Sequence, residues 1–435
     1  MVRPLMAAVC VWLALHPATL AQGPAMAQPA DLSGRWVLYL VRSGEKFDPA
    51  RVQLKEDGNK VVGTLNELKL VGIIRGQSVD LTAISANGDE FGKLKIEVVG
   101  AELRGILKRG TVETNLEMHR IVGDGLLPQT RTFVPTAYSR VFTETVAPVL
   151  HINSGDTIKT TTVDAGGFDE NGVSRSLGGN PQTGPFYVEG ALPGDTLAIK
   201  IDRIHLNRPS ASSTSSIVPV ALTADYYRNA QLDDKVSGEW KLDLDHGTAS
   251  LANPTEHLKN YKIELRPMLG CVAVAPGNKA AFRTAWLGPW GGNMDYQGVQ
   301  EGTTVYLPVA TEGALLYVGD AHAQQGDGEL NGNALETSVD VEFTVKVIPG
   351  VSTSGPRAEN DEYLMSMGIA GSLDDALKLA TTQLAQWIES EYKLTPNEAA
   401  IVVGTSIHYE IAEVVDPQVN VVAKIKKAAL AQILK

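Results

Sequence analysis

The sequence predicts an α+β chain that is mainly β: a small antiparallel β-barrel or meander, followed by a large β-sandwich or barrel-like domain with helices near its end. Segments rich in β-branched residues recur along the chain and are separated by Asp-Gly and Asn-Gly turns. The chain contains 42 Gly and 22 Pro, but only 6% of its residues are aromatic. This composition suits many short strands joined by tight turns. Helix signals gather in the C-terminal part.

The first 27 residues have the pattern of a secretory signal peptide. Arg3 precedes an apolar run over residues 5–15, and small-residue cleavage sites follow it. The run is too short to span a bilayer comfortably, and Pro17 disfavours the alternative of a buried N-terminal helix. We therefore expect export to the periplasm or the medium, with no membrane association after cleavage. Cleavage leaves Cys271 as the single cysteine, so no internal disulfide is expected.

Residues 31–121 are predicted to form a small all-β accessory domain of six to eight strands. Leu94 and Ile96 alternate with Lys93 and Lys95, a pattern that gives a strand one buried and one wet face. The region contains no convincing catalytic cluster. Further strands are expected at residues 35–41, 60–65 and 78–84.

The residues after this domain divide into a linker at 122–140, rich in Gly and Pro, and a main domain at 141–435. Gly-Asp turns precede several strands of the main domain, and 210–216 is expected to be a flexible polar loop. Ser372 with Asp375, and Thr395 with Glu398, have the spacing of helix capping boxes.

The formal charge of the chain limits its partners. The net charge of -12 argues against a nucleic-acid or anionic-membrane partner, because both require a basic surface.

The densest group of chemically active residues lies at 319–329 (GDAHAQQGDGE). Asp320 and His322 share one face of an extended segment because side chains alternate along a strand. Glycines at 326 and 328 allow a sharp turn that would return Asp327 and Glu329 toward them. Imidazole and carboxylates together are suitable ligands for zinc, with calcium or another divalent ion as alternatives. The competing interpretation is a surface hairpin turn that carries an unremarkable histidine.

Two other segments are glycine-rich and polar. At 290–295 (WGGNMD), Gly291 and Gly292 would let the backbone approach a ligand closely, while Asn293 and Asp295 supply polar groups. Asp164 precedes a Gly-Gly pair in the other segment. Each segment taken alone is equally compatible with ordinary loop architecture.

Rival hydrolase mechanisms have weaker sequence support. The chain contains no Gly-x-Ser-x-Gly nucleophile elbow. Cys271 lies in an apolar, strand-like segment that suits a packed thiol better than a nucleophile.

These polar segments, together with others, resemble the acetamidase/formamidase family. The resemblance spans about residues 141–430 and leaves out the N-terminal β domain. The matching stretches are 183–197 (TGPFYVEGALPGDTL), 291–295 (GGNMD), 304–309 (TVYLPV), 319–329, 334–336 (ALE) and 414–417 (VVDP).

The resemblance implies a β-rich amidohydrolase that cleaves the C–N bond of a small formamide-like or acetamide-like substrate, and it implies a homo-oligomer. We hypothesise that Asp164, Asp295 and His322 hold a divalent ion, and that Glu329 is a further ligand or the general base. Backbone N–H groups at Gly291 and Gly292, with Asn293, would stabilise the oxyanion. The alternatives are a non-catalytic exported binding protein on the same fold and a hydrolase of larger amides. The secondary site candidates are Asp320, Gln325, Asp327, Glu189 and Glu336.

Overall fold

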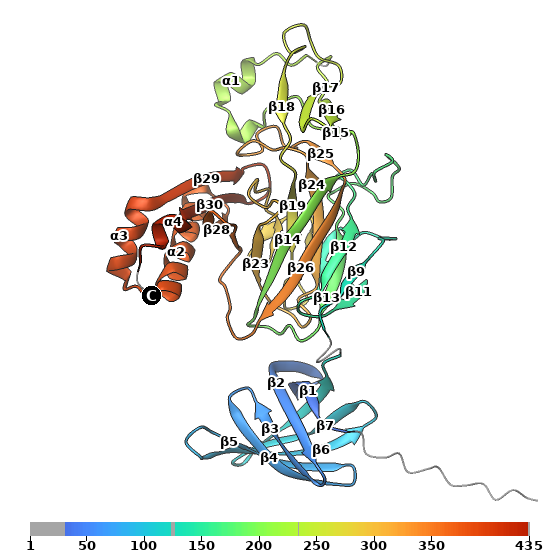
Figure 1. The fold of residues 1–435 in the computed structure, drawn as a ribbon, viewed down its shortest axis with the longest axis vertical. Coiled ribbons are helices and arrows are strands. Elements are labelled where there is room, and N and C mark those ends of the chain that lie inside the picture. Colours follow the sequence, from blue (N-terminus) through green and yellow to red (C-terminus); the bar gives the residue numbers. More distant parts are fainter. Residues whose placement is uncertain (1–30, 123–126, 234, 434–435) are drawn as a thin grey trace, which may run out of the picture. The chain divides into compact units, whose positions relative to one another are not determined.

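The computed structural model describes residues 31–122, 127–233 and 235–433 (Figure 1). The predicted signal peptide, residues 1–27, lies outside the described residues. The chain forms two compact units. The first contains the described residues up to 45 and residues 51–120, and the second contains 46–50 and the described residues from 121 onward. As expected, strands dominate both units.

The first unit is a closed eight-stranded antiparallel barrel, as the sequence predicted. Each strand pairs with the next along the chain, and β1 pairs with β8 to close the ring. Leu94 and Ile96 are buried while Lys93 and Lys95 are exposed, so the predicted alternation is confirmed. Large aliphatic side chains fill the interior, which is therefore a packed core. The strands are β1 Gly34–Arg42, β2 Glu45–Asp57, β3 Lys60–Leu65, β4 Leu68–Arg75, β5 Ser78–Ile84, β6 Glu90–Val99, β7 Glu102–Arg109 and β8 Val112–Arg120.

The second unit contains two large sheets that share one hydrophobic core. Buried side chains from both sheets form a single cluster. Phe186 and Phe343 meet across it edge to face, with ring centroids 5.6 Å apart. Their strands are β13, in the eleven-stranded sheet, and β26, in the nine-stranded sheet. The unit is thus a β-sandwich whose inner faces are held together by burial of apolar side chains.

The nine-stranded sheet has the order β29-β30-β28-β27-β23-β14-β26-β12-β9. Its first strand in sequence, β9, lies inside the segment expected to be a linker and pairs in parallel with β12. The strands are β9 Thr130–Thr132, β12 Thr157–Thr161, β14 Thr196–Leu206, β23 Thr304–Pro308, β26 Val339–Ile348, β27 Arg357–Glu359, β28 Tyr363–Ala370, β29 Ile407–Glu413 and β30 Val419–Lys426.

The eleven-stranded sheet has the main order β18-β17-β16-β15-β25-β24-β19-β22-β21, and β13 and β11 join it beside β24. Residues 210–216 were expected to form a flexible loop, but Ser210–Ser212 forms β15 because it pairs with both β16 and β25. The strands are β11 Leu150–Ile152, β13 Thr183–Val188, β15 Ser210–Ser212, β16 Glu239–Asp243, β17 Thr248–Leu251, β18 Lys262–Glu264, β19 Met268–Ala273, β21 Leu287–Gly288, β22 Gly291–Asn293, β24 Leu316–His322 and β25 Glu336–Thr337. A separate pair consists of β10 Val141–Thr143 and β20 Ala281–Arg283.

Helices α2, α3 and α4 lie beside the C-terminal strands β28 and β30, whereas α1 lies near β18 (Figure 1). Both predicted starts are confirmed: Ser372 caps α2, and Thr395 with Glu398 forms a capping box on α3. β28 comes close to α2 at Gly368, where an added Cβ would lie 1.9 Å from the carbonyl oxygen of Ala376. No helix among the described residues has the length and apolar character needed to cross a membrane. The helices are η1 Pro219–Ala221, α1 Ala224–Asn229, α2 Leu373–Tyr392, α3 Pro396–Ser406 and α4 Lys427–Leu430.

Candidate metal centre

Four carboxylates surround the imidazole of His322 inside the sandwich. The Nε2 atom of His322 lies 3.3 Å from Glu336 Oε1, 3.5 Å from Asp320 Oδ1 and 3.9 Å from Asp295 Oδ1. Glu329 joins the group, because one of its carboxylate oxygens lies within 4.8 Å of ligand atoms of Asp295 and His322. All five side chains are buried. The structure therefore brings together residues from three separate stretches of the chain.

Pairing in the eleven-stranded sheet explains how the cluster forms. Strand β24 carries Asp320 and His322, whose side chains meet as the predicted alternation requires. Strand β25 pairs with β24 so that Glu336 lies opposite His322. On the other side β19 separates β24 from β22, and Asp295 follows β22 by two residues.

Gly270 of β19 makes room for two of the carboxylates. A Cβ atom at this position would lie 2.3 Å from Asp295 Oδ1 and 2.6 Å from Asp320 Oδ2. Real Cβ atoms do not make contacts this short, so any side chain here would displace both acids. The glycine is required because of the close approach of side chains to its Cα.

Three cluster residues have left-handed backbone conformations. The φ angles are 41° at Asp295, 56° at Asp320 and 47° at Glu329. This region is unfavourable for residues with a Cβ, and such strain persists only when the surrounding structure enforces it. Its concentration in one cluster indicates that the placement of these carboxylates matters for function.

Gln325 fixes the orientation of His322. Its Oε1 lies 3.0 Å from His322 Nδ1, and its Nε2 donates to the backbone oxygens of Asp295 and Ala412 at 2.5 and 3.0 Å. Because the amide Nε2 is committed to these donations, Oε1 accepts from Nδ1–H. With Nδ1 held in this way, Nε2 is the ring nitrogen that faces the carboxylates, and in the neutral imidazole it would be free to bind a metal ion.

Asn293 holds a second carboxylate beside Asp295. Its Nδ2 donates to Asp295 Oδ2 and to Asp416 Oδ2, both at 2.8 Å. Its Oδ1 accepts a short hydrogen bond from Asn180 Nδ2. The side chain is thus engaged with residues of the chain, and its role is to position two acids.

The cluster carries more negative charge than its surroundings compensate. Burial raises the pKa of Glu329 to about 8, and it raises the pKa of Asp295 well above its usual value, with repulsion from Glu329 and Asp320 adding to the effect. Burial disfavours the charged form of His322, yet Glu336 and Asp320 outweigh it and hold the pKa of the imidazole well above normal. The four carboxyl groups therefore cannot all ionise beside one imidazolium, and a bound cation would favour their ionised forms.

The donor set fits a divalent metal ion. Asp295 Oδ1, His322 Nε2 and Glu336 Oε2 are buried and form no hydrogen bond with the described residues. Leaving such atoms unsatisfied is costly, and all three residues belong to two groups of possible metal ligands that share His322. Carboxylate oxygens and one imidazole nitrogen are suitable ligands for zinc and similar ions.

The comparisons with known proteins agree with this architecture. Residues 275–425 match the model of the Acetamidase/Formamidase family. The sandwich is similar to an acetamidase from Yersinia enterocolitica, with a TM-score of 0.60 and 27% identity over 72% of this chain and 96% of that chain. A predicted acetamidase/formamidase from Thermoanaerobacter tengcongensis gives a TM-score of 0.58 and 26% identity over 70% of this chain and 98% of that chain. The second unit is thus similar in sequence and fold to proteins of the acetamidase/formamidase family.

Two curated relatives match shorter stretches of the chain. The acetamidase of Mycolicibacterium smegmatis is 41% identical over 61 residues, 14% of this chain and 15% of that protein. A putative formamidase of Schizosaccharomyces pombe is 39% identical over 59 residues, 13% of this chain and 14% of that protein. The matches thus span about one seventh of the length of each relative.

Two predicted roles in the second unit are not supported by the structure. Asp164 was expected to bind metal, but its Oδ2 forms a buried ion pair with Arg208 Nη2 at 2.8 Å, and its Oδ1 accepts from the backbone N–H of Phe168. Gly291 and Gly292 were expected to stabilise an oxyanion. Both glycines lie in β22, which pairs with β19 on one side and β21 on the other. An added Cβ at either position would clash with the backbone of a neighbouring strand, so the glycines allow close strand packing.

Two secondary candidates also lie outside the cluster. Glu189 Oε1 is bonded to the exposed His151 at 2.7 Å. Asp327 lies at the surface of the turn that returns Glu329, and burial raises its pKa. The turn therefore brings back only one of the two acids that were expected.

Sequence reasoning missed several residues that support the site around His322. Among them are Gly270, Asn180 and Asp416. Glu413 accepts from the backbone N–H groups of Val415 and Asp416, and burial raises its pKa to about 9. The matching stretch 414–417 was the one available signal for this corner of the site.

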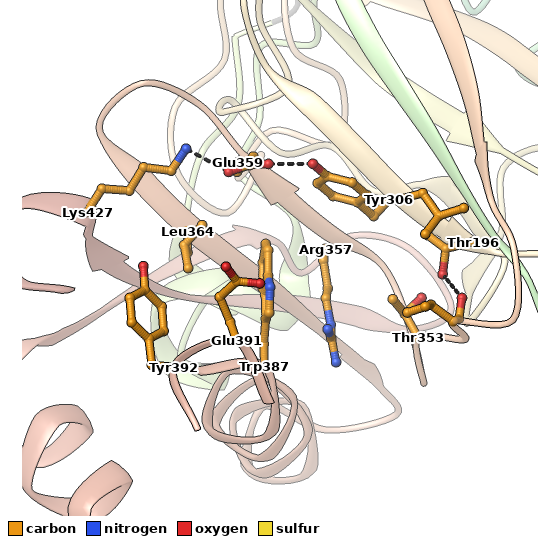
Figure 2. A pocket seen from close by; sticks show the side chains of 12 residues that line it. Thr196, Tyr306, Thr353, Arg357, Glu359, Leu364, Trp387, Glu391, Tyr392 and Lys427 are labelled. Carbon is orange, nitrogen blue, oxygen red and sulfur yellow. Dashed lines mark hydrogen bonds and ion pairs between the residues drawn. The ribbon is translucent and has the colours of Figure 1, made fainter. Parts of the chain in front are cut away.

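A cavity of about 340 Å³ lies beside the cluster in the second unit. Glu329 and Gln325 line it, together with Trp240 and Tyr261. A different cavity of about 450 Å³ lies between α2 and strands β23 and β27, and contains none of the predicted site residues (Figure 2). In that cavity Glu359 accepts a hydrogen bond from the hydroxyl of Tyr306 and forms an ion pair with Lys427 (Figure 2).

Proposed function

We propose that the chain hydrolyses the C–N bond of amides at the cluster around His322, with a divalent ion, zinc first, held by Asp295, Asp320, His322 and Glu336. The observation that carries the proposal is that three buried ligand atoms without hydrogen bonds belong to two groups of possible metal ligands that share His322, in a unit that matches the acetamidase/formamidase family model. An ion bound there supplies Lewis-acid chemistry: it lowers the pKa of water and polarises a carbonyl.

Glu329 is suited to act as the general base. Of the four carboxylates around His322, it is the one that lines the cavity beside the cluster. Ala334 N–H donates to its Oε1 at 2.9 Å and fixes the carboxylate. A pKa near neutrality lets such a group accept a proton from the attacking water and pass it to the departing nitrogen.

The balanced reaction adds one water to the amide. A C–O bond forms, the C–N bond breaks, and the nitrogen leaves with the proton that Glu329 carried. The products are a carboxylate and ammonia, which is protonated in water near neutral pH.

The decisive comparison is between His322→Ala and His246→Ala, with chelator and added zinc. His246 is 79% exposed and pairs only with Asp243, so it is a matched control. We expect ammonia release from a panel of amides by the wild type and His246→Ala, and no turnover by His322→Ala at a temperature at which this variant is still folded. Undiminished turnover by His322→Ala would reject the site. A wild-type protein that binds the ion and hydrolyses no amide would instead support a binding protein on this fold.

Two predictions from the sequence enter the proposal unchanged. The N-terminal pattern supports export, and the family resemblance supports a homo-oligomer. Cell fractionation and light scattering of the purified protein test these two points separately.

A further inference from the structure

We infer that the preferred substrate carries an aromatic or similarly bulky apolar acyl group, which binds against Trp240 and Tyr261. This inference rests on the proposed function and narrows its substrate class. Formamide and acetamide would then be poor substrates.

The first support is where the cavity lies. Glu329 belongs both to the cluster and to the cavity wall, whereas Asp295, Asp320, His322 and Glu336 do not line the cavity. An amide held beside Glu329 can therefore extend the rest of its structure into this cavity. Its volume of about 340 Å³ falls in the range of sites for ligands much larger than acetamide, roughly 300–1,000 Å³.

The second support is the chemistry of the cavity wall. Five large apolar or aromatic side chains line it, and two of them remain open to water: Tyr261 is 50% exposed and Leu330 is 43% exposed. A group of exposed apolar side chains around one cavity marks a binding surface. Acetamide has a single methyl group and would leave most of this surface in water. The five residues are Trp240, Tyr261, Ile263, Leu330 and Leu335.

The third support is that Trp240 is held in place before any ligand arrives. Its indole Nε1 donates to Ser213 Oγ at 3.0 Å, and its ring lies 6.3 Å from the ring of Tyr261 at an angle of 59°. The two residues come from β16 and from the segment just before β18, which are joined through β17. Two rings fixed at such an angle form a corner that a flat apolar group can fill with both face and edge contacts.

The test compares kcat/KM for benzamide and phenylacetamide with kcat/KM for acetamide and formamide, using the zinc-loaded full chain. We expect the wild type to favour the aromatic amides by at least about tenfold, and Trp240→Ala to reduce that preference by about 10- to 100-fold. Trp387→Ala is the matched control. Trp387 lines the unrelated cavity beside Arg357, and its loss should leave the substrate ratio unchanged (Figure 2).

The outcomes separate this inference from the proposed function. Hydrolysis of the short amides with equal or better efficiency, and an unchanged ratio in Trp240→Ala, would overturn the inference and leave the amidase proposal intact. Failure to hydrolyse any amide would reject the proposed function itself. If Trp240→Ala does not fold, Tyr261→Phe and Tyr261→Ala give the same comparison at an exposed position.

Discussion

Replacing Gly270 with alanine tests whether the carboxylates must lie where the structure places them. The added Cβ would lie 2.3 Å from Asp295 Oδ1 and 2.6 Å from Asp320 Oδ2, whereas 3.0 Å is the shortest contact that real Cβ atoms make. Asp295 Oδ1 must therefore retreat by at least 0.7 Å, and Asp320 Oδ2 by at least 0.4 Å. Metal sites hold ligand distances within about 0.2 Å, so both shifts exceed what coordination tolerates.

The expected effect of Gly270→Ala is larger on metal binding than on folding. Overpacking a core position costs about 1–3 kcal/mol, while loss of two well-placed ligands should weaken zinc binding by at least about tenfold. Isothermal titration with zinc measures the affinity, and denaturant unfolding measures the stability. Gly404→Ala in α3 is the control, because a Cβ there meets nothing within 4 Å. Wild-type zinc affinity in a folded Gly270→Ala protein would show that zinc binding does not require Asp295 and Asp320 at these positions.

Three more predictions follow from the charges of the site. Arg208→Met should destabilise the protein by about 3–5 kcal/mol in denaturant unfolding, because it leaves Asp164 buried without its partner. Asp164→Asn should keep the metal stoichiometry of the wild type, and a loss of bound metal in this variant would show that Asp164 is a ligand after all. The pKa of Glu329 is raised from 4.5 to about 8, so the folded metal-free protein keeps a proton that the unfolded chain releases. Thermal melts should therefore show the metal-free protein losing stability, by on the order of a few kcal/mol, as pH rises from about 5 to 8, and a melting temperature that rises with pH would contradict this sign. A bound zinc ion would favour the deprotonated forms of its ligands and of the nearby Glu329, so its affinity should increase over this pH range, and a pH-independent affinity in titration calorimetry would contradict this.

The sequence predicted those parts of the site that depend on local periodicity. Asp320 and His322 meet because side chains alternate along β24, and Glu329 returns because glycines at 326 and 328 allow the turn. The barrel strands also follow from the alternation of apolar and polar residues, and the helix caps follow from pairs of polar residues three positions apart.

The parts that sequence reasoning missed depend on contacts between distant segments. Gly270 is essential only because β19 lies between the strands that carry the two acids, and nothing in its own neighbourhood predicts that pairing. Asp164 resembled a ligand in its glycine-rich segment until Arg208, 44 residues further along, proved to be its partner. Asn180 and Asp416 reach Asn293 across more than 100 residues of chain.

Metal content measured together with turnover tests whether amide hydrolysis depends on an ion bound at the cluster around His322. The full chain is purified, stripped with chelator and titrated with zinc, while bound ion and ammonia release from the amide panel are followed in the same samples. We expect activity to fall to background when the metal is removed and to return in proportion to added zinc, with saturation at one ion per cluster. Full activity in a protein that carries no ion would contradict it.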